Sequence, residues 1–219
     1  MSTRTDAIAP PAPARSGRRR LVIAAIALVV LAGIAFDTKV VRIGSEQDQT
    51  AAGFSPATFG AENFPGIKDS ILARAVDAAE LSQAIAADKA AATKAHGVAA
   101  GVGAVFPVKF TGTVGEGKSG IYNVDVPGLA GETKIRVQTG PAINGTDLRD
   151  STGTIKFGDF KNQIEYQNAG SAINNAMKDA VLAGIDNSAL TGKTITVTGA
   201  FTLVNPKNWL VTPVELAVQ

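Results

Sequence analysis

The sequence predicts an α+β domain that is mainly β and follows a single N-terminal membrane segment. After Val105, apolar and polar residues alternate with a period of two in several segments, as in half-buried antiparallel strands. Two of these segments, FTGTV and VTGAF, carry an internal glycine, which often marks a bulge or a bend at a barrel corner. A long helical segment precedes the strands, and one helix is inserted late. We therefore expect a small, partly open, OB-like β-barrel, with a flat α+β sheet covered by both helices as the alternative.

The N-terminal region is typical of an exported protein. Residues 1–20 are rich in Pro, Ala, Ser and Arg, lack apolar periodicity and are predicted to form a disordered cytoplasmic arm. Residues 21–36 are uncharged and apolar, although a full membrane span needs about 20 residues. They predict a signal anchor or a cleaved signal peptide, since Gly33 and Ala35 fit a small-residue cleavage pattern.

The charge distribution around this segment sets the expected topology. The arginines before it favour a cytoplasmic N-terminus and an exported C-terminal bulk. Of the two interpretations, we expect the uncleaved anchor. The chain would then be a single-pass protein of the cell inner membrane, bound to the cytoplasmic membrane through residues 21–36, with its domain in the periplasm.

Residues 37–65 show little periodicity and are predicted to form an extended lead-in, in which Phe54, Phe59 and Phe64 anchor a loop to the domain. Residues 66–96 are predicted to form a helical segment. Pro65 suits the first helical position, Asn63 can cap the helix, and a break near residues 86–88 would give two shorter helices. The apolar face of this segment comprises Ile67, Ile71, Ala75, Ala78 and Ile85.

Residues 105–219 are predicted to form the OB-like β domain. Its strands are recognised by alternation and end at turn signals such as Pro127-Gly128 and Asn205-Pro206. Pro213 is expected at an edge or a bulge of the last strand. The expected strands lie at about 105–114, 121–126, 133–139, 191–204 and 210–216, and the inserted helix at about 171–183.

The segment from Thr139 to Ala169 is the candidate functional region. It is dense in Gly, Asn and Asp and carries three aromatic residues, so we expect a shaped loop with a short strand pair. The candidate binding residues are Asn144, Thr146, Asp147, Arg149, Asp150, Phe157, Asp159, Phe160, Asn162 and Gln163.

Several residues of this region have two interpretations. Arg149 either braces the loop by bidentate pairing with an aspartate or binds an external carboxylate, and bracing is the commoner role. The aspartates either ligate calcium or form turns, and the spacing of an EF-hand is absent. Phe157, Phe160 and Tyr166 either pack in the core or form a stacking platform.

The composition argues against several functions. The chain has no cysteine and one histidine, His96, so neither a thiolate nucleophile nor an ordinary zinc site is expected. Gly192-Lys193-Thr194 lacks the first glycine of a phosphate loop. Residues 37–219 carry 16 basic and 18 acidic side chains, because five of the 21 basic and one of the 19 acidic residues precede them. No catalytic residue, metal, cofactor or nucleic acid is therefore predicted.

A set of motifs resembles the predicted periplasmic lipoproteins known as domain of unknown function 2291. The motifs are Gly140-Pro141, the run 145–150, the run 157–160, Asn162-Gln163 and Thr212-Pro213. The resemblance implies an exported location and an OB-like barrel, with no established activity, and some members accompany sugar-type ABC transport systems. This chain lacks the cysteine that a lipoprotein modifies, so residues 21–36 would themselves serve as the anchor.

The expected function is an exported, membrane-tethered accessory or binding domain without catalytic activity, associated with a solute transport system. Its contact surface would be the loop Thr139–Gln163, and its partner a transporter component. The alternative is a small-solute binder whose pocket contains Arg149, Phe157, Phe160 and Tyr166. A carboxylate-based enzyme is the third interpretation.

Overall fold

The computed structural model describes residues 22–23, 25–28, 30, 54–101 and 103–219. The chain divides into two compact units, Met1–Ala51 and Ala52–Gln219. In the first unit the described residues between 22 and 30 are helical. None of the described helices is long and apolar enough to span a bilayer. The predicted arm and most of the predicted membrane segment lie outside the described residues, so the anchor stays a prediction.

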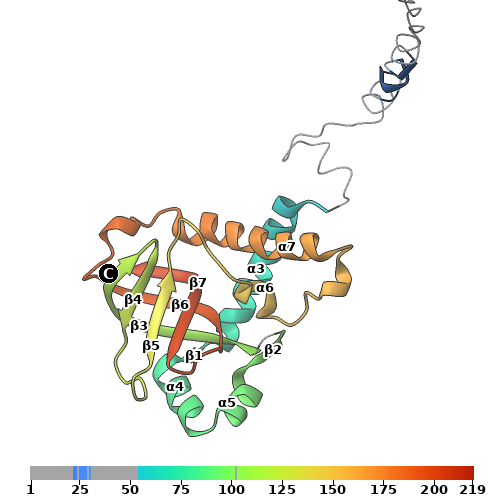
Figure 1. The fold of residues 1–219 in the computed structure, drawn as a ribbon. Helices are drawn as coiled ribbons and strands as arrows, with labels where there is room; N and C mark the ends of the chain where they lie inside the picture. Colours follow the sequence, from blue (N-terminus) through green and yellow to red (C-terminus); the bar gives the residue numbers. More distant parts are fainter. Residues whose placement is uncertain (1–21, 24, 29, 31–53, 102) are drawn as a thin grey trace, which may run out of the picture. The chain divides into compact units, whose positions relative to one another are not determined.

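The second unit contains a β-barrel (Figure 1). Its strands are β3 (Gly103–Lys118), β4 (Ile121–Asp125), β5 (Lys134–Gln138), β6 (Thr194–Thr202) and β7 (Asn208–Val218). They follow one another as β3-β4-β5-β7-β6, and β6 pairs with β3 to complete the ring. The β5–β7 pair is parallel, and the other pairs of the ring are antiparallel. The expected OB-like barrel is therefore present, and its strand pairing is closed rather than partly open.

Closure depends on β3, which pairs with a different strand along each half. Its residues 105–113 pair with β6, and its residues 113–118 pair with β4. Gly112 lies at this change of partner, where a Cβ would be only 2.4 Å from the carbonyl oxygen of Asp125. Gly199 lies at a bulge between β6 and β7, where a Cβ would be 2.4 Å from the carbonyl oxygen of Thr212. Both glycines thus allow close approach of neighbouring strands, and Gly199 lies at a bulge, one of the two features that an internal glycine indicated.

One hydrophobic cluster fills the barrel. Phe201 stacks between Phe106 and Trp209, with ring centroids 5.8 and 4.5 Å apart respectively. All three side chains are fully buried. A second cluster lies where α3 (Pro56–Arg74) and α7 (Gln163–Met177) pack beside each other against the barrel. Its members include Ile67, Ile71, Val105, Ile173, Met177, Ala200 and Val214.

The helices before the barrel differ from the expected extended lead-in and single long helix. Helix α3 already begins at Pro56, so Phe59 and Phe64 are helical and Pro65 lies inside the helix. Asn63 does not cap it; its Nδ2 donates to the carbonyl of Phe59 at 2.9 Å. Tertiary packing on α7 explains the difference, because it stabilises a helix whose own sequence pattern is weak.

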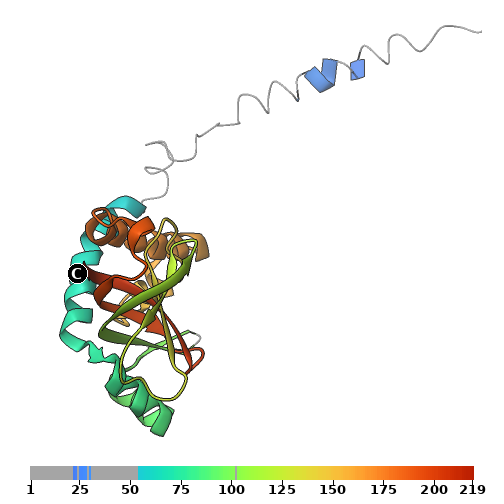
Figure 2. The same cartoon turned by 90° about the vertical axis from the view of Figure 1, so that its left-hand side faces the viewer.

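After α3 the chain forms a short strand and two further helices (Figure 2). β1 (Val76–Asp77) and β2 (Val98–Ala100) pair with β3 outside the ring. Helices α4 (Ala78–Ala87) and α5 (Lys89–His96) lie between them. The carboxylates of Asp77 and Asp88 cap these helices by accepting from backbone N–H groups. The expected break near residues 86–88 is confirmed, and the earlier break at Ala75 was missed.

The segment Thr139–Ala169 contains no strand among its residues, all of which are described, so the expected strand pair is wrong. It contains α6 (Asp147–Asp150), a 3₁₀ turn at Phe157–Asp159 and the start of α7. Helix α7 begins at Gln163, eight residues before the expected start, and continues into a π turn at Lys178–Leu182. Asn162 caps it, because its Oδ1 accepts from the backbone N–H of Glu165 at 2.9 Å.

The close approach at the two strand glycines gives a stability prediction. Gly112→Val and Gly199→Val should each lower the free energy of unfolding by more than about 1 kcal/mol, because the added methyl groups overlap neighbouring strands. Urea melts of a fragment of residues 37–219 measure this. Gly66→Ala is the control, since nothing lies within 4 Å of its Cβ position in α3. It should be neutral or stabilising. Two neutral valine variants would contradict the proposed role of the glycines.

Candidate functional site

The loop between β5 and α7 is attached to the barrel by Gln138, the last residue of β5. Its side chain is fully buried. Nε2 donates to the carbonyl of Asn144 at 2.9 Å and to Oγ1 of Thr212 at 2.8 Å, and Oε1 accepts from the N–H of Asn144 at 2.9 Å. The side-chain amide of Gln138 thus both donates to and accepts from the backbone of Asn144, in the same way as the backbone of a paired strand. The first turn of the loop is therefore fixed to β5 and β7.

Asp147 connects α6 to the barrel. Its Oδ1 accepts from the hydroxyl of Thr202 on β6, and its Oδ2 accepts from that of Thr212 on β7 at 3.2 Å. Burial raises the pKa of this carboxyl above its ordinary value, and the two threonine hydrogen bonds oppose the rise. The charge of Asp150 adds a smaller upward contribution. Thr212 also contacts Gln138, so the two attachments form one network.

Arg149 braces the loop from within. Its Nε and Nη2 donate to the two carboxylate oxygens of Asp150, at 2.7 and 3.1 Å. Its Nη1 donates to the carbonyl of Tyr166 at 3.1 Å, and its Cζ lies 3.6 Å from the centroid of the Tyr166 ring. Thr146 donates to Asp150 at 2.7 Å. Of the two interpretations of Arg149, this geometry fits the brace, because all three guanidinium nitrogens are engaged within the protein.

Side chains from helices α3 and α7 also hold the loop in place. In α7 the buried Asn174 donates through Nδ2 to the carbonyl of Gly145 at 3.0 Å. In α3 Arg74 donates through Nη2 to the carbonyl of Ser151 at 2.8 Å. Backbone groups of the loop are thus satisfied by side chains from both helices. The loop backbone is positioned by the surrounding elements at residues 144, 145 and 151.

The outer part of the loop carries an aromatic cluster, defined as Phe54, Phe59, Phe157, Phe160 and Tyr166. Phe160 lies at its centre, with ring centroids 5.5 Å from Phe54, 5.6 Å from Phe59 and 5.4 Å from Tyr166. Phe157 contacts Tyr166 at 5.7 Å and is 52% exposed. The aromatic residues are therefore neither core nor a flat platform. They form a half-buried group on the surface, of which Phe157 is the exposed member.

The predicted site residues fall into three groups. Thr146, Asp147, Arg149 and Asp150 form the polar network beneath the loop, and Phe157 and Phe160 belong to the aromatic cluster. The remaining four have local contacts: Asn144 is held by its backbone, Asp159 accepts from the N–H of Lys156 at 2.9 Å, and Asn162 and Gln163 begin α7. Sequence reasoning missed Gln138, Thr202, Thr212, Phe54 and Phe59 as parts of the site.

A comparison with known protein families gives a match, which covers most of the chain. The family of predicted periplasmic lipoproteins DUF2291 matches residues 24–217. The chain belongs to this family. Its description supports an extracytoplasmic location and assigns no function. No protein with a curated description matches the chain.

A solved structure resembles this family member. It is the crystal structure of an OB-fold protein from Thermotoga maritima MSB8 at 1.90 Å resolution, with a TM-score of 0.60 and 20% sequence identity. The match covers 76% of this chain and 99% of that chain. At this identity the likeness concerns the fold alone, and it confirms the OB-like barrel.

A hollow of about 350 Å³ lies beside the aromatic cluster. Its walls include Asp150, Lys156, Phe157 and Tyr166, together with the turn after β2. Of the four residues expected in a ligand pocket, Phe157 and Tyr166 line this hollow, whereas Arg149 and Phe160 do not. No group of His, Cys, Asp or Glu suited to a metal ion occurs among the described residues.

The brace gives a prediction with an internal control. Arg149→Ala should lower the free energy of unfolding by about 2–3 kcal/mol, because it removes the counter-ion of the mostly buried Asp150 carboxylate and one donor to the Tyr166 carbonyl. The two side chains are only 8% and 16% exposed. The Lys207–Glu132 pair is 70% and 84% exposed, so Lys207→Ala should change stability by less than about 0.5 kcal/mol. Urea melts of residues 37–219 would measure both, and equal effects would contradict the brace.

The raised pKa of Asp147 gives a pH prediction. Because the folded protein binds this proton more tightly than the unfolded chain, Asp147 stabilises the fold below its unfolded pKa. This contribution is lost as pH rises through the folded pKa. The stability of the wild type relative to Asp147→Asn should therefore fall with rising pH above about pH 4. Unfolding at a series of pH values measures it.

The contribution of Asp186 to stability should change with pH in the opposite direction, so this residue is a control. Hydrogen bonds from Ser188 lower its pKa, so its contribution is present above the unfolded pKa and is lost as pH falls. A pH profile of Asp147→Asn that runs parallel to the wild type would rule out the titration of Asp147.

Proposed function

We propose that this protein is a non-catalytic accessory module of a solute transport system, held at the outer face of the inner membrane. In this proposal residues 21–36 anchor the chain, since it contains no cysteine for lipid attachment. The barrel serves as a scaffold. The aromatic cluster and the loop beneath it form the surface that contacts a membrane component of the transporter.

The observation that carries the proposal is an apolar surface on a fixed support. Phe157 is 52% exposed and Ile164, in the first turn of α7, is 68% exposed. Exposed aromatic residues on a pre-organised backbone are typical of the centre of protein interfaces, because little conformational entropy is lost on binding. The loop beneath them is bonded to β5, β7, α3 and α7.

The state of the polar residues supports the non-catalytic part of the proposal. A general acid, base or nucleophile must reach a substrate atom within hydrogen-bond distance. Asp147 is engaged with two threonine hydroxyls, and the carboxylate of Asp150 accepts from Arg149 and Thr146. These groups have structural partners, and the aromatic residues beside them carry no reactive group apart from the Tyr166 hydroxyl.

A second candidate function is the binding of a small solute in the hollow beside the cluster. The observation that favours it is that two aromatic rings and the carboxylate of Asp150 line one cavity of about 350 Å³. Such a lining suits a ligand with an apolar body and a donor or cationic group. Solute binding and the accessory function use overlapping residues. They differ in the partner, which is a small molecule in the first case and a protein in the second.

The contact surface can be tested in intact cells. With a photo-crosslinking phenylalanine analogue at position 157, irradiation should attach the protein to a permease subunit in the membrane, identified by mass spectrometry. The same analogue at Thr111, an exposed position on β3, is the control and should give no such product. Alkaline phosphatase fused after Gln219 should be active, which establishes export separately. Crosslinks of equal yield at both positions, or only to soluble periplasmic proteins, would contradict the proposal.

A further inference from the structure

The outer face of β4 and β5 is a second surface with the features of a ligand site. No described helix is drawn across these two strands, whereas α3 and α7 cover another side of the barrel (Figure 1). Asn123 on β4 is directly opposite Arg136 on β5 in the register. Their neighbours Val124 and Ile135 are buried in the barrel, so Asn123 and Arg136 point outward. Polar side chains from two strands thus share one open face.

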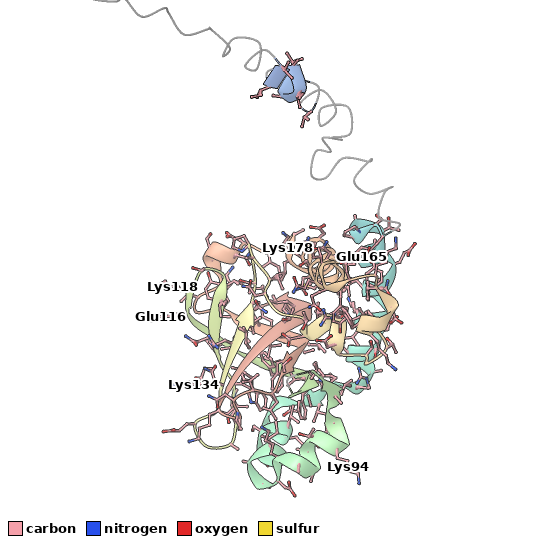
Figure 3. The ribbon with its side chains drawn as sticks, turned by 45° about the vertical axis from the view of Figure 1, so that its right-hand side comes forward. Lys94, Glu116, Lys118, Lys134, Glu165 and Lys178 are labelled. Carbon is pink, nitrogen blue, oxygen red and sulfur yellow. The ribbon has the colours of Figure 1, made fainter. Side chains whose placement is uncertain are left out.

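This face is hollowed on both sides of Asn123. One hollow, of about 400 Å³, is lined by Glu116, Lys118, Ser119 and Arg136. The other, of about 590 Å³, is lined by Lys134, Asp125 and the turn between β4 and β5. Asn123 belongs to the wall of both hollows, so they adjoin as one trough. Glu116, Lys118 and Lys134 lie on this side of the barrel, away from Glu165 and Lys178 near α7 (Figure 3).

Arg136 is the residue of the trough that indicates an anionic ligand. Its Nε donates to Oδ1 of Asn208 on β7 at 3.0 Å, which orients the guanidinium. Within the described residues, neither terminal nitrogen of Arg136 has a hydrogen bond, and no ion pair involves Arg136, Lys118 or Glu116. An oriented guanidinium with an open fork is suited to bidentate binding of a carboxylate. Arg149, by contrast, is fully engaged within the protein.

The remaining groups narrow the ligand class. Lys118 can bind a second negative charge. The Nδ2 of Asn123 donates to the carbonyl of Glu116 at 3.1 Å, so its Oδ1 faces a ligand as an acceptor, and the side chains of Ser119 and Glu116 add the donor and acceptors that hydroxyl groups require. Neither hollow has an aromatic residue in its wall, so bases have nothing to stack on. Two adjoining hollows fit a chain of rings rather than a single small ion. In OB barrels generally, the second and third strands carry the ligand face, and oligosaccharides are among the ligands.

We propose that the outer face of β4 and β5 binds an oligosaccharide that carries carboxylate groups. Arg136 binds one carboxylate with its two terminal nitrogens, and Asn208 holds the guanidinium in place. Lys118 and Lys134 bind charges at either side, and Asn123 contacts the ring hydroxyls between them. The site is separate from the aromatic cluster, so it stands whether or not that cluster contacts a transporter.

Calorimetric titration of the full-length chain tests the site. Trigalacturonate should bind at least about 10-fold more tightly than maltotriose, which has the same number of rings and no charge. Tricarballylate supplies three carboxylates without sugar rings, and hexathymidylate supplies an anionic chain with bases. Both should bind more weakly than trigalacturonate. Equal or tighter binding of any of these three comparators would overturn the proposal.

Variants assign the binding to the trough. Arg136→Gln should weaken trigalacturonate binding by about 10-fold or more, since one charge-assisted contact is lost. Lys193→Gln removes an exposed charge elsewhere and should bind as the wild type does. Lys118 is also exposed, so Lys118→Gln should leave the fold intact. This variant provides a second test of the site if Arg136→Gln melts at a lower temperature than the wild type. Wild-type affinity in both Arg136→Gln and Lys118→Gln would overturn the proposed site.

Discussion

The architecture depends on the length of one strand, β3, and on its pairing with two others. β3 pairs with β6 along its first half and with β4 along its second half, so it joins the two ends of what would otherwise be an open sheet. Closure leaves the ring without a free edge and requires an interior filled by side chains. The stack of Phe106, Phe201 and Trp209 fills it. The change of partner occurs beside Gly112, where a side chain would overlap the neighbouring strand.

Polar contacts fix the loop on this scaffold, in addition to the burial of Leu148 in the second hydrophobic cluster. A buried amide or carboxylate destabilises the fold unless its hydrogen bonds are made. Gln138 meets this condition through Asn144 and Thr212, and Asp147 through Thr202 and Thr212. Because any displacement of the loop would break several of these bonds together, its position is specified closely. The aromatic cluster is therefore presented on a support that need not rearrange when a partner binds.

The sequence predicted the strands better than the helices, for identifiable reasons. Apolar and polar residues alternate along each strand, because one face of the strand points into the barrel. This alternation can be recognised in the sequence even when the neighbouring strands are unknown. Helix α3 was missed before Pro65 because its stability comes from packing on α7. The start of α7 carried a readable signal, since Asn162 is followed three residues later by Glu165. The contacts of Asp147 join residues 55 and 65 positions apart, and no single-sequence pattern indicates such pairs.

Two arginines show why composition cannot separate a brace from a binding group. In the sequence Arg149 lies between two aspartates and Arg136 lies between two apolar residues, and neither pattern shows which arginine has partners in the fold. Arg149 has a carboxylate, a carbonyl and an aromatic face as partners, so an incoming anion would have to displace Asp150. Arg136 has one neutral partner, which orients it without neutralising it. A guanidinium in that state retains its charge for a ligand, and the difference arises from the fold: β5 and β7 run side by side, which places Asn208 next to Arg136. The barrel therefore determines which arginine is structural and which is available for recognition.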